Sequence, residues 1–176
     1  FIEASAEHVA AALREAPKRG RVLFSAHGLP KNIVAGGDPY QHCCEKTARA
    51  IVGRLGIQGL DWQMCYQSRV GPLEWIGPST EEALEKAAED NIGIVVYPLA
   101  FVSEHVETLV EIDIEYRHRA KQLGIPYFAK APTVGTHPRF IEGLRNIALA
   151  AAEGKFKPSV CPAQFSRCHC RTGGRT

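Results

Sequence analysis

The chain has 176 residues, enough for one domain with a sizeable buried core. Hydrophobic residues make up 45% of it and charged residues 23%, the balance of an ordinary globular protein. Because the formal net charge is only +2 and no basic run is present, the sequence gives no reason to expect nucleic-acid binding. The longest apolar stretch, from Ile92 to Phe101, has the length of a strand and contains Pro98, so we expect no membrane span.

Apolar residues recur along the chain with helical and strand periods in alternation. Helices are expected over residues 3–16, 39–55, 79–90, 106–123 and 137–154. Strands are expected over residues 21–25, 60–67, 92–97 and 126–129. Asp38 is a candidate cap for the second helix, and Ser79 with Glu82 forms a candidate capping box for the third. The alternation predicts an α/β fold, a four-stranded parallel sheet flanked by helices, followed by an irregular tail that contains cysteines.

A histidine lies directly after the first predicted strand, in Ser25-Ala26-His27-Gly28-Leu29-Pro30. Parallel α/β sheets bind their ligands at the carboxyl ends of the strands, so His27 is placed where chemistry is expected. An imidazole can accept or donate a proton, or bind a metal. A histidine that only caps a turn is the alternative interpretation.

The helix expected after the third strand begins with an acidic segment. At about 100° per residue on an α-helix, Glu104, Glu107, Glu111 and Glu115 would lie on one face, and His105 would join them at the helix start. Carboxylates with an imidazole suit a divalent cation such as Fe²⁺ and can pass protons. A solvated acidic stripe is the alternative, and a local π-bulge would change which side chains face a pocket.

The loop after the second strand is rich in glycine and proline and carries Trp75. The indole offers a flat apolar face to a flat ligand, or it packs the loop onto its own sheet. The tail holds Cys161, Cys168 and Cys170, whose close spacing suggests zinc or an iron–sulfur cluster. Three thiols are one short of the usual four ligands. Cys43, Cys44 and Cys65 are candidates for the fourth, although Cys65 is more simply a core residue, and the fourth could equally lie in a part of the protein outside this sequence.

Three segments of the chain resemble the ferrochelatase family. Ser-x-His-Gly-Leu-Pro followed by Gly-Asp-x-Tyr is matched between Ser25 and Tyr40. Gln-Ser-x-Val-Gly-Pro-x-x-Trp-x-Gly-Pro is matched from Gln67 to Pro78, and His-x-Glu-Thr-Leu-x-Glu-x-Asp-x-Glu-Tyr from His105 to Tyr116. The resemblance extends from the first strand to the tail. It implies a Rossmann-like, chelatase-type domain over residues 1–157, the carboxyl-terminal half of a ferrochelatase, with a separate tail over residues 158–176.

The resemblance implies the insertion of Fe²⁺ into a porphyrin, protoporphyrin foremost, which forms haem in the last step of haem biosynthesis. It implies catalytic roles for His27, Glu107 and His105, and a metal path through His27, Glu107, Glu111 and Glu115. It implies porphyrin contacts for Trp75, Phe101, Ser68 and Gln67. The amino-terminal domain of the same chain, which forms the other wall of the cleft in this family, is expected to be missing from the sequence.

Several alternatives stay open. One is a chelatase that inserts cobalt or nickel into another tetrapyrrole, and another is a non-catalytic haem-binding or iron–sulfur sensor module. Some ferrochelatases hold a [2Fe–2S] cluster with the spacing Cys-x-x-Cys-x-x-x-x-Cys, whereas Cys161, Cys168 and Cys170 follow Cys-x₆-Cys-x-Cys. A bacterial cytoplasmic location is expected, with peripheral contact at the inner membrane open, or a mitochondrial one in a eukaryote.

Overall fold

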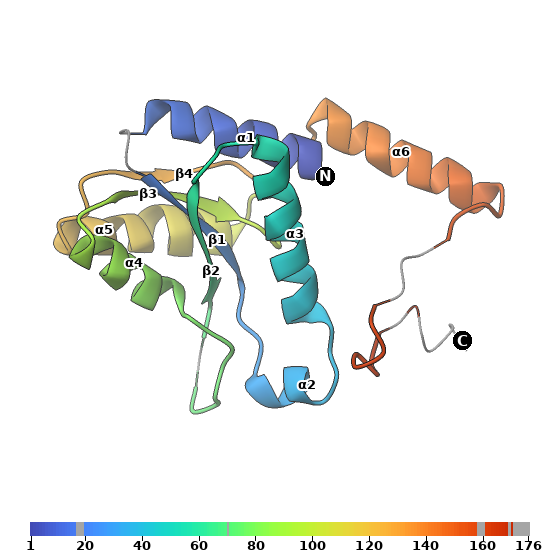
Figure 1. Cartoon of the computed structure of the whole chain (residues 1–176), viewed down its shortest axis with the longest axis horizontal. Helices are drawn as coiled ribbons and strands as arrows, with labels where there is room; N and C mark the ends of the chain where they lie inside the picture. The colour runs from blue at the N-terminus through green and yellow to red at the C-terminus, as the bar shows by residue number, and fades with distance from the viewer. Residues whose placement is uncertain (17–19, 70, 158–160, 169, 171–176) are drawn as a thin grey trace.

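Four parallel strands form a single sheet (Figure 1). The computed structural model describes residues 1–16, 20–69, 71–157, 161–168 and 170. Within that part the strand order is β2-β1-β3-β4, with β1 at Gly20–His27, β2 at Asp61–Gln67, β3 at Gly93–Pro98 and β4 at Phe128–Lys130. The predicted α/β fold is confirmed. One boundary differs: β1 runs on to His27, so this histidine is the last residue of the strand and does not follow it.

The helices follow the predicted order with two differences. They are α1 at Ile2–Glu15, α2 at Lys31–Ala35, α3 at Tyr40–Leu55, α4 at Thr80–Glu89, α5 at Arg117–Gln122 and α6 at Pro138–Ala152. The short helix α2 was not predicted. The helix predicted over residues 106–123 is present, but its first part, Glu107–Tyr116, is a π-helix, η1, that continues directly into α5.

Helices cover both faces of the sheet because alternate strand side chains point to opposite sides. Val22, Phe24 and Ala26 of β1 are fully buried in a cluster with residues of α1 and α3. Leu23, between them in sequence, is buried in a second cluster with residues of α4, η1 and α5. The predicted capping box is present: Glu82 N donates to Ser79 Oγ at 3.0 Å, and Ser79 N donates to the Glu82 carboxylate at 2.5 Å.

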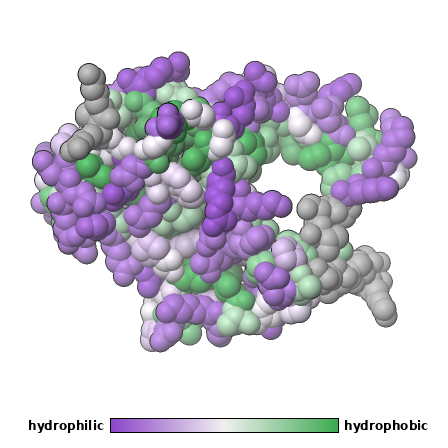
Figure 2. All heavy atoms as spheres, in the orientation of Figure 1, coloured by the Kyte–Doolittle hydropathy of each residue, from purple (hydrophilic) through white to green (hydrophobic). Residues whose placement is uncertain are grey.

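The last helix, α6, lies beside α1 and away from the sheet (Figure 1). The rings of Phe1 and Phe140 meet edge to face with centroids 5.9 Å apart, and His137 Nε2 lies 3.1 Å from the Glu7 carboxylate. No residue of α6 is buried. Four large apolar side chains of α6 are exposed: Ile141, Leu144, Ile147 and Leu149. Figure 2 shows hydrophobic surface over this helix.

The predicted division between a domain at 1–157 and a tail at 158–176 falls beside residues that the structure leaves undescribed. Residues 158–160, 169 and 171–176 lie outside the described part, as do 17–19 and 70. The boundary therefore stays a prediction. None of the helices in the described part is long and apolar enough to cross a membrane.

Candidate site at the carboxyl edge of the sheet

The three motif segments meet at one edge of the sheet. His27 and Gln67 are paired at the last position of β1 and β2, and Gly28 N donates to the Gln67 carbonyl at 2.8 Å. From the same edge, Gln67 Nε2 reaches the carbonyl oxygen of Glu107 at 3.5 Å. Gln67 therefore lies between the histidine loop on one side and the first turn of η1 on the other.

The hydrogen bond of the His27 ring defines which nitrogen carries the proton. Its Nδ1 lies 2.7 Å from the carbonyl oxygen of Gly28. A carbonyl only accepts, so Nδ1 must donate, and in the neutral ring the lone pair is left on Nε2. Tyr40 Oη also donates to the His27 carbonyl at 3.0 Å, which fixes the backbone at this position. The half-buried imidazole thus presents a basic nitrogen to the edge of the sheet.

The Trp75 loop is held against the histidine loop. Ile76 N donates to the Leu29 carbonyl at 3.0 Å, and Pro30 and Trp75 form an isolated antiparallel bridge. A Cβ added to Gly28 would lie 2.9 Å from the Gln67 carbonyl oxygen and 3.1 Å from Trp75 Cε3. Glycine is needed here because the indole lies directly on the backbone next to His27. The buried Nε1 of Trp75 has no hydrogen-bond partner among the described residues.

The π-helical form of η1 changes the expected acidic face. A π-helix pairs residue i with residue i+5, so side chains five apart become neighbours. Tyr116 Oη donates to the Glu111 carboxylate at 2.8 Å across this interval. Glu104 precedes η1 and therefore does not continue the row of carboxylates. Glu104 is therefore not part of the acidic face that the α-helical spacing predicted.

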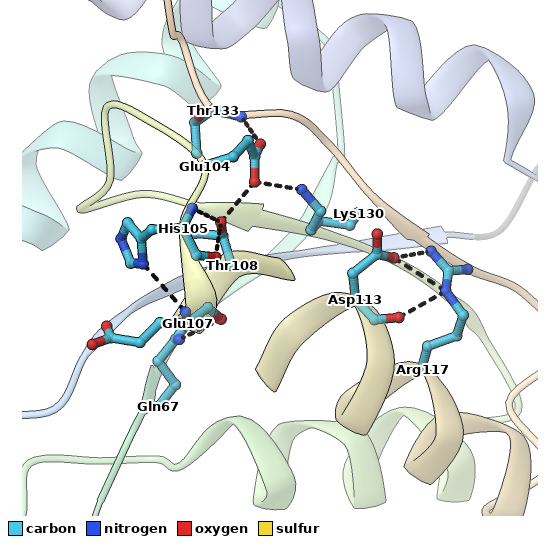
Figure 3. Close-up of polar contacts among 9 residues, drawn as sticks. All are labelled: Gln67, Glu104, His105, Glu107, Thr108, Asp113, Arg117, Lys130 and Thr133. Atoms are coloured by element: carbon cyan, nitrogen blue, oxygen red, sulfur yellow. Dashed lines mark hydrogen bonds and ion pairs between the residues drawn. The ribbon is translucent and has the colours of Figure 1, made fainter. Parts of the chain in front are cut away.

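Glu104 instead joins the start of η1 to the end of β4 and the segment that follows β4 (Figure 3). Its carboxylate accepts from Lys130 Nζ at 2.8 Å, from Thr108 Oγ1 at 2.6 Å and from Thr133 N at 2.8 Å. Burial raises the pKa of Glu104, but the hydrogen bonds from Lys130, Thr108 and Thr133 outweigh burial and lower the pKa to about 2. The side chain of Lys130 is only 8% exposed, so this ion pair is partly withdrawn from water.

His105 and Glu107 form the part of the site that faces away from this ion pair (Figure 3). Glu107 N donates to His105 Nδ1 at 3.2 Å, so the neutral His105 ring carries its proton on Nε2. The rings of Phe101 and His105 meet edge to face with centroids 4.8 Å apart. The Glu107 carboxylate makes no hydrogen bond to any residue that the structure describes, and in Figure 3 it points away from its neighbours.

Glu111, in contrast, is fully engaged. Its carboxylate accepts from Gln67 Nε2 at 3.1 Å, Ser68 N at 2.8 Å, Ser68 Oγ at 2.5 Å and Tyr116 Oη at 2.8 Å. Ser68 has a left-handed backbone with φ of 58°, and both of its donors are directed at Glu111. Burial first, and then the Glu111 carboxylate, raise the pKa of Tyr116 above its usual range. A cavity of about 120 Å³ adjoins these groups.

A larger hollow than this one lies elsewhere on the described surface. It measures about 760 Å³ and is found at the amino ends of β1 and β2, lined by Leu13, Arg21 and Leu60 among others. Arg21 donates to Asp61 at 2.9 Å and to Asp90 at 3.0 Å in this hollow. We assign no site to it.

The site residues expected from the sequence thus fall into groups. His27, Trp75, Phe101, His105 and Glu107 surround the end of β2. The side chain of Gln67 is buried and bonded to Ser25 and Glu111, so it is turned into the protein. Glu115 lies on the exposed side of η1. The sequence motifs contain Ser25, but no pattern in the sequence indicated its hydrogen bond with Gln67.

The described tail residues pack against the segment between α2 and α3 and against the first turn of α3. Arg167 N donates to the Gly37 carbonyl at 3.1 Å, and the rings of Phe165 and His42 lie 4.8 Å apart. The Cys161 thiol has a raised pKa of about 11, first because it shares a hydrogen bond with Cys168, then through burial and the nearby Cys43 thiol.

Thiol neighbours alone do not make a finished metal site. Among the described residues, no group of three or more histidine, cysteine, aspartate or glutamate side chains is arranged to hold a metal ion. Cys44 and Cys65 are buried in the two cores, and burial raises the pKa of each thiol to about 11. Their environment is that of structural cysteines.

Fold and site together define an α/β protein with a basic imidazole and a carboxylate at the carboxyl edge of a parallel sheet. The chain belongs to the ferrochelatase family, whose sequence profile matches residues 1–152. It is 44% identical over 182 residues to a ferrochelatase of Caulobacter vibrioides, covering 98% of this chain and 52% of that protein. It is 46% identical to ferrochelatases of Phenylobacterium zucineum, over 90% of this chain, and of Rickettsia bellii, over 88%. The chain spans about half the length of these relatives.

Proposed function

We propose that the chain is the carboxyl-terminal half of an enzyme that inserts Fe²⁺ into a porphyrin to make haem. The observation that carries this proposal is the position of His27 and Glu107, the proposed catalytic pair, next to Gln67. They flank Gln67, and their Nε2 and carboxylate make no hydrogen bond to any described residue. A metal-insertion site needs such groups, because one must receive a pyrrole proton while the other meets the metal.

The surroundings of the pair support a flat apolar substrate. Trp75 lies against Gly28 on one side, and Phe101 and His105 lie on the other. Large apolar side chains of η1 are exposed beside them, with Leu109 46% and Val110 38% exposed. We propose that Trp75 and Phe101 contact the macrocycle. We propose further that His105, through its Nε2 proton, modulates the reactivity of His27 and Glu107. Glu115 is proposed as an outer carboxylate on the path of the metal or the protons.

The test is anaerobic Fe²⁺ insertion into protoporphyrin and coproporphyrin by the full-length protein. His27→Ala and Glu107→Gln are each expected to lower turnover by about 100-fold or more, the usual effect of losing a proton-transfer group. His118→Ala is the matched control, because this histidine is exposed on α5 and bonds only to Gln122 among the described residues. Wild-type turnover in both site variants would refute the assignment.

The same preparation separates the alternatives. Insertion of Co²⁺ or Ni²⁺ into another tetrapyrrole, with no activity on Fe²⁺, would favour the related chelatase. Tight haem binding without any metal insertion would favour the sensor module. A bacterial cytoplasmic location, with or without contact at the inner membrane, stays a prediction.

We propose that the amino-terminal half of the full-length protein packs on α6. The chain before Phe1 would enter the fold beside Phe140, at the start of this helix. The exposed apolar stripe contains Ile141, Leu144 and Ile147. The polar face of α6 carries glutamate as well as arginine, whereas helices that lie on membranes have a polar face rich in Lys and Arg. A protein surface of the same chain is therefore the favoured occupant.

We also propose a [2Fe–2S] cluster held by Cys161, Cys168 and Cys170, with Cys43 of α3 as the fourth ligand. Thiolates are the ligands that such clusters take, and Cys43 is close enough to Cys161 to contribute to the raised pKa of the Cys161 thiol. The packing of Phe165 on His42 supports this arrangement, since it carries the tail to the start of α3.

Spectroscopy on anaerobically purified full-length protein tests the cluster independently of activity. Visible absorption, an EPR signal after reduction, and equal amounts of iron and acid-labile sulfide are expected. Cys43→Ser should abolish all three, and Cys44→Ala, a change in the buried core, should preserve them. A colourless, iron-free protein that is folded and active would end this proposal.

A further inference from the structure

A buried chain of hydrogen bonds runs beneath the site. Ser25 Oγ donates to Gln67 Oε1 at 2.7 Å, and Ser25 Oγ lies 3.1 Å from Thr80 Oγ1. Thr80 Oγ1 also lies 3.5 Å from Cys65 Sγ. Ser25, Thr80 and Cys65 are fully buried and Gln67 is 1% exposed, so these groups bond to one another in place of water.

The directions of the hydrogen bonds from Gln67 to Ser25 and Thr80 follow from the contacts of Gln67 with η1. Gln67 faces two acceptors on η1, the Glu111 carboxylate at 3.1 Å and the Glu107 carbonyl at 3.5 Å, so its NH₂ group must point there. Its Oε1 then points to Ser25, which uses its single proton on this bond. Ser25 can then only accept from Thr80, so the hydrogen bond between the two hydroxyl groups is donated by Thr80, whose single proton also has Cys65 Sγ within reach as an acceptor.

The hydrogen bonds that the Glu111 carboxylate accepts define its role in the same way. An ionised carboxylate has about four lone-pair sites, and Glu111 receives four donors from Gln67, Ser68 and Tyr116. In this arrangement it keeps no lone pair for a metal ion. Gln67 is the last residue of β2 and Ser68 follows it, so Glu111, four residues after Glu107, acts as the anchor that joins the sheet to η1.

We propose that Ser25 and Thr80 are positioning residues: their hydroxyl groups orient the Gln67 amide toward η1, which anchors Glu111 and places Glu107 beside His27. The inference rests on the proposed function for its activity readout. It assigns Glu111 to the support of the site, where the sequence predicted a metal ligand. Neither hydroxyl touches the substrate, so both act through Gln67.

The test uses the full-length protein with Ser25→Ala, Thr80→Val and Thr80→Ser. Outer hydrogen bonds of this kind are worth about 10- to 100-fold in activity. We expect Ser25→Ala to lower kcat for Fe²⁺ insertion about tenfold and leave KM for the porphyrin within about twofold. Thr80→Val should lower kcat less, because Ser25 still bonds to Gln67, and Thr80→Ser should restore it.

A second readout does not depend on activity. The side-chain NH₂ resonances of Gln67 should be protected from solvent exchange in the wild type and in Thr80→Ser, and lose protection in Ser25→Ala. Leu84→Val is the matched control, because Leu84 is fully buried one turn along α4 from Thr80 and makes no side-chain hydrogen bond. It should lower Tm without changing kcat or the Gln67 signal.

These outcomes separate the two proposals. Loss of Gln67 protection in Ser25→Ala, in a protein that never inserts iron, would support the positioning chain and refute the proposed function. Wild-type kcat and unchanged Gln67 protection in Ser25→Ala would overturn the inference. If Ser25→Ala does not fold, a kcat for Thr80→Val equal to that for Leu84→Val at the same Tm would overturn it as well.

Discussion

The ion pair between Glu104 and Lys130 makes a quantitative prediction about acid stability. The pKa of Glu104 is about 2 in the folded protein against an ordinary value of 4.5, which corresponds to roughly 3 kcal/mol of stabilisation before screening by solvent. The Glu104 side chain is 31% exposed, so we reduce this to about 1–2 kcal/mol. Removing the charge also leaves Lys130, which is 8% exposed, without its partner. We therefore expect Glu104→Gln to cost about 2 kcal/mol at pH 7.

The sign of the pH dependence follows from the lowered pKa. The unfolded state takes up the proton first, so the contribution of Glu104 is complete above about pH 4.5 and is lost as the pH falls toward about 2. Urea unfolding of wild type and Glu104→Gln, followed by tryptophan fluorescence, measures this at pH 7 and at steps down to pH 3. The difference in free energy of unfolding should shrink over that interval. Glu142→Gln, an exposed change on α6, is the control and should have no effect at any pH.

Two outcomes would contradict this reasoning. If the two proteins differ by the same free energy at pH 7 and pH 3, the loss comes from packing and not from the charge. If they do not differ at pH 7, solvent screening has removed the contribution entirely. In either case the fastening of η1 to Thr133 and Lys130 would have to depend on other contacts.

Further predictions concern the glycine of the site, a helix cap and the surface of α6. Gly28→Ala would place a Cβ 2.9 Å from the Gln67 carbonyl oxygen. We therefore expect thermal unfolding to show a free energy of unfolding lower by about 1–3 kcal/mol, and iron insertion to show turnover at least tenfold lower. Normal activity would show that the Trp75 loop moves freely. Ser79→Ala should remove one half of the capping box of α4 and cost about 1 kcal/mol in urea unfolding, with Fe²⁺ insertion unchanged. Ile147→Glu should weaken the association of the separately expressed halves of the full-length protein about tenfold or more, as measured by calorimetry. Asn146→Glu, on the polar face of α6, should not weaken it. Equal binding by both variants would place the partner elsewhere.

Local sequence patterns were enough for the order of elements in this protein. The predicted strand at 92–97 is apolar on both faces, as expected in a parallel sheet that helices cover on both sides. Ser79 and Glu82, three residues apart, indicated the start of α4 because together they form a capping box. His27 could also be placed at the carboxyl edge, because a parallel sheet brings all strand ends of that kind together. Such features depend on neighbours in sequence or on periodicity alone.

The tertiary structure decided which of the acidic side chains support the fold and which are left for chemistry. Glu104, Glu107 and Glu111 are equivalent in the sequence. In the structure Glu104 pairs with Lys130, Glu111 accepts hydrogen bonds from residues at the end of β2, and the Glu107 carboxylate makes no hydrogen bond to a described residue. The π-helical turn that separates them is stabilised by contacts with other elements, so α-helical spacing could not predict it. Periodicity states which residues share a face, whereas the partner of a buried polar group is chosen by whatever the fold brings within hydrogen-bond distance.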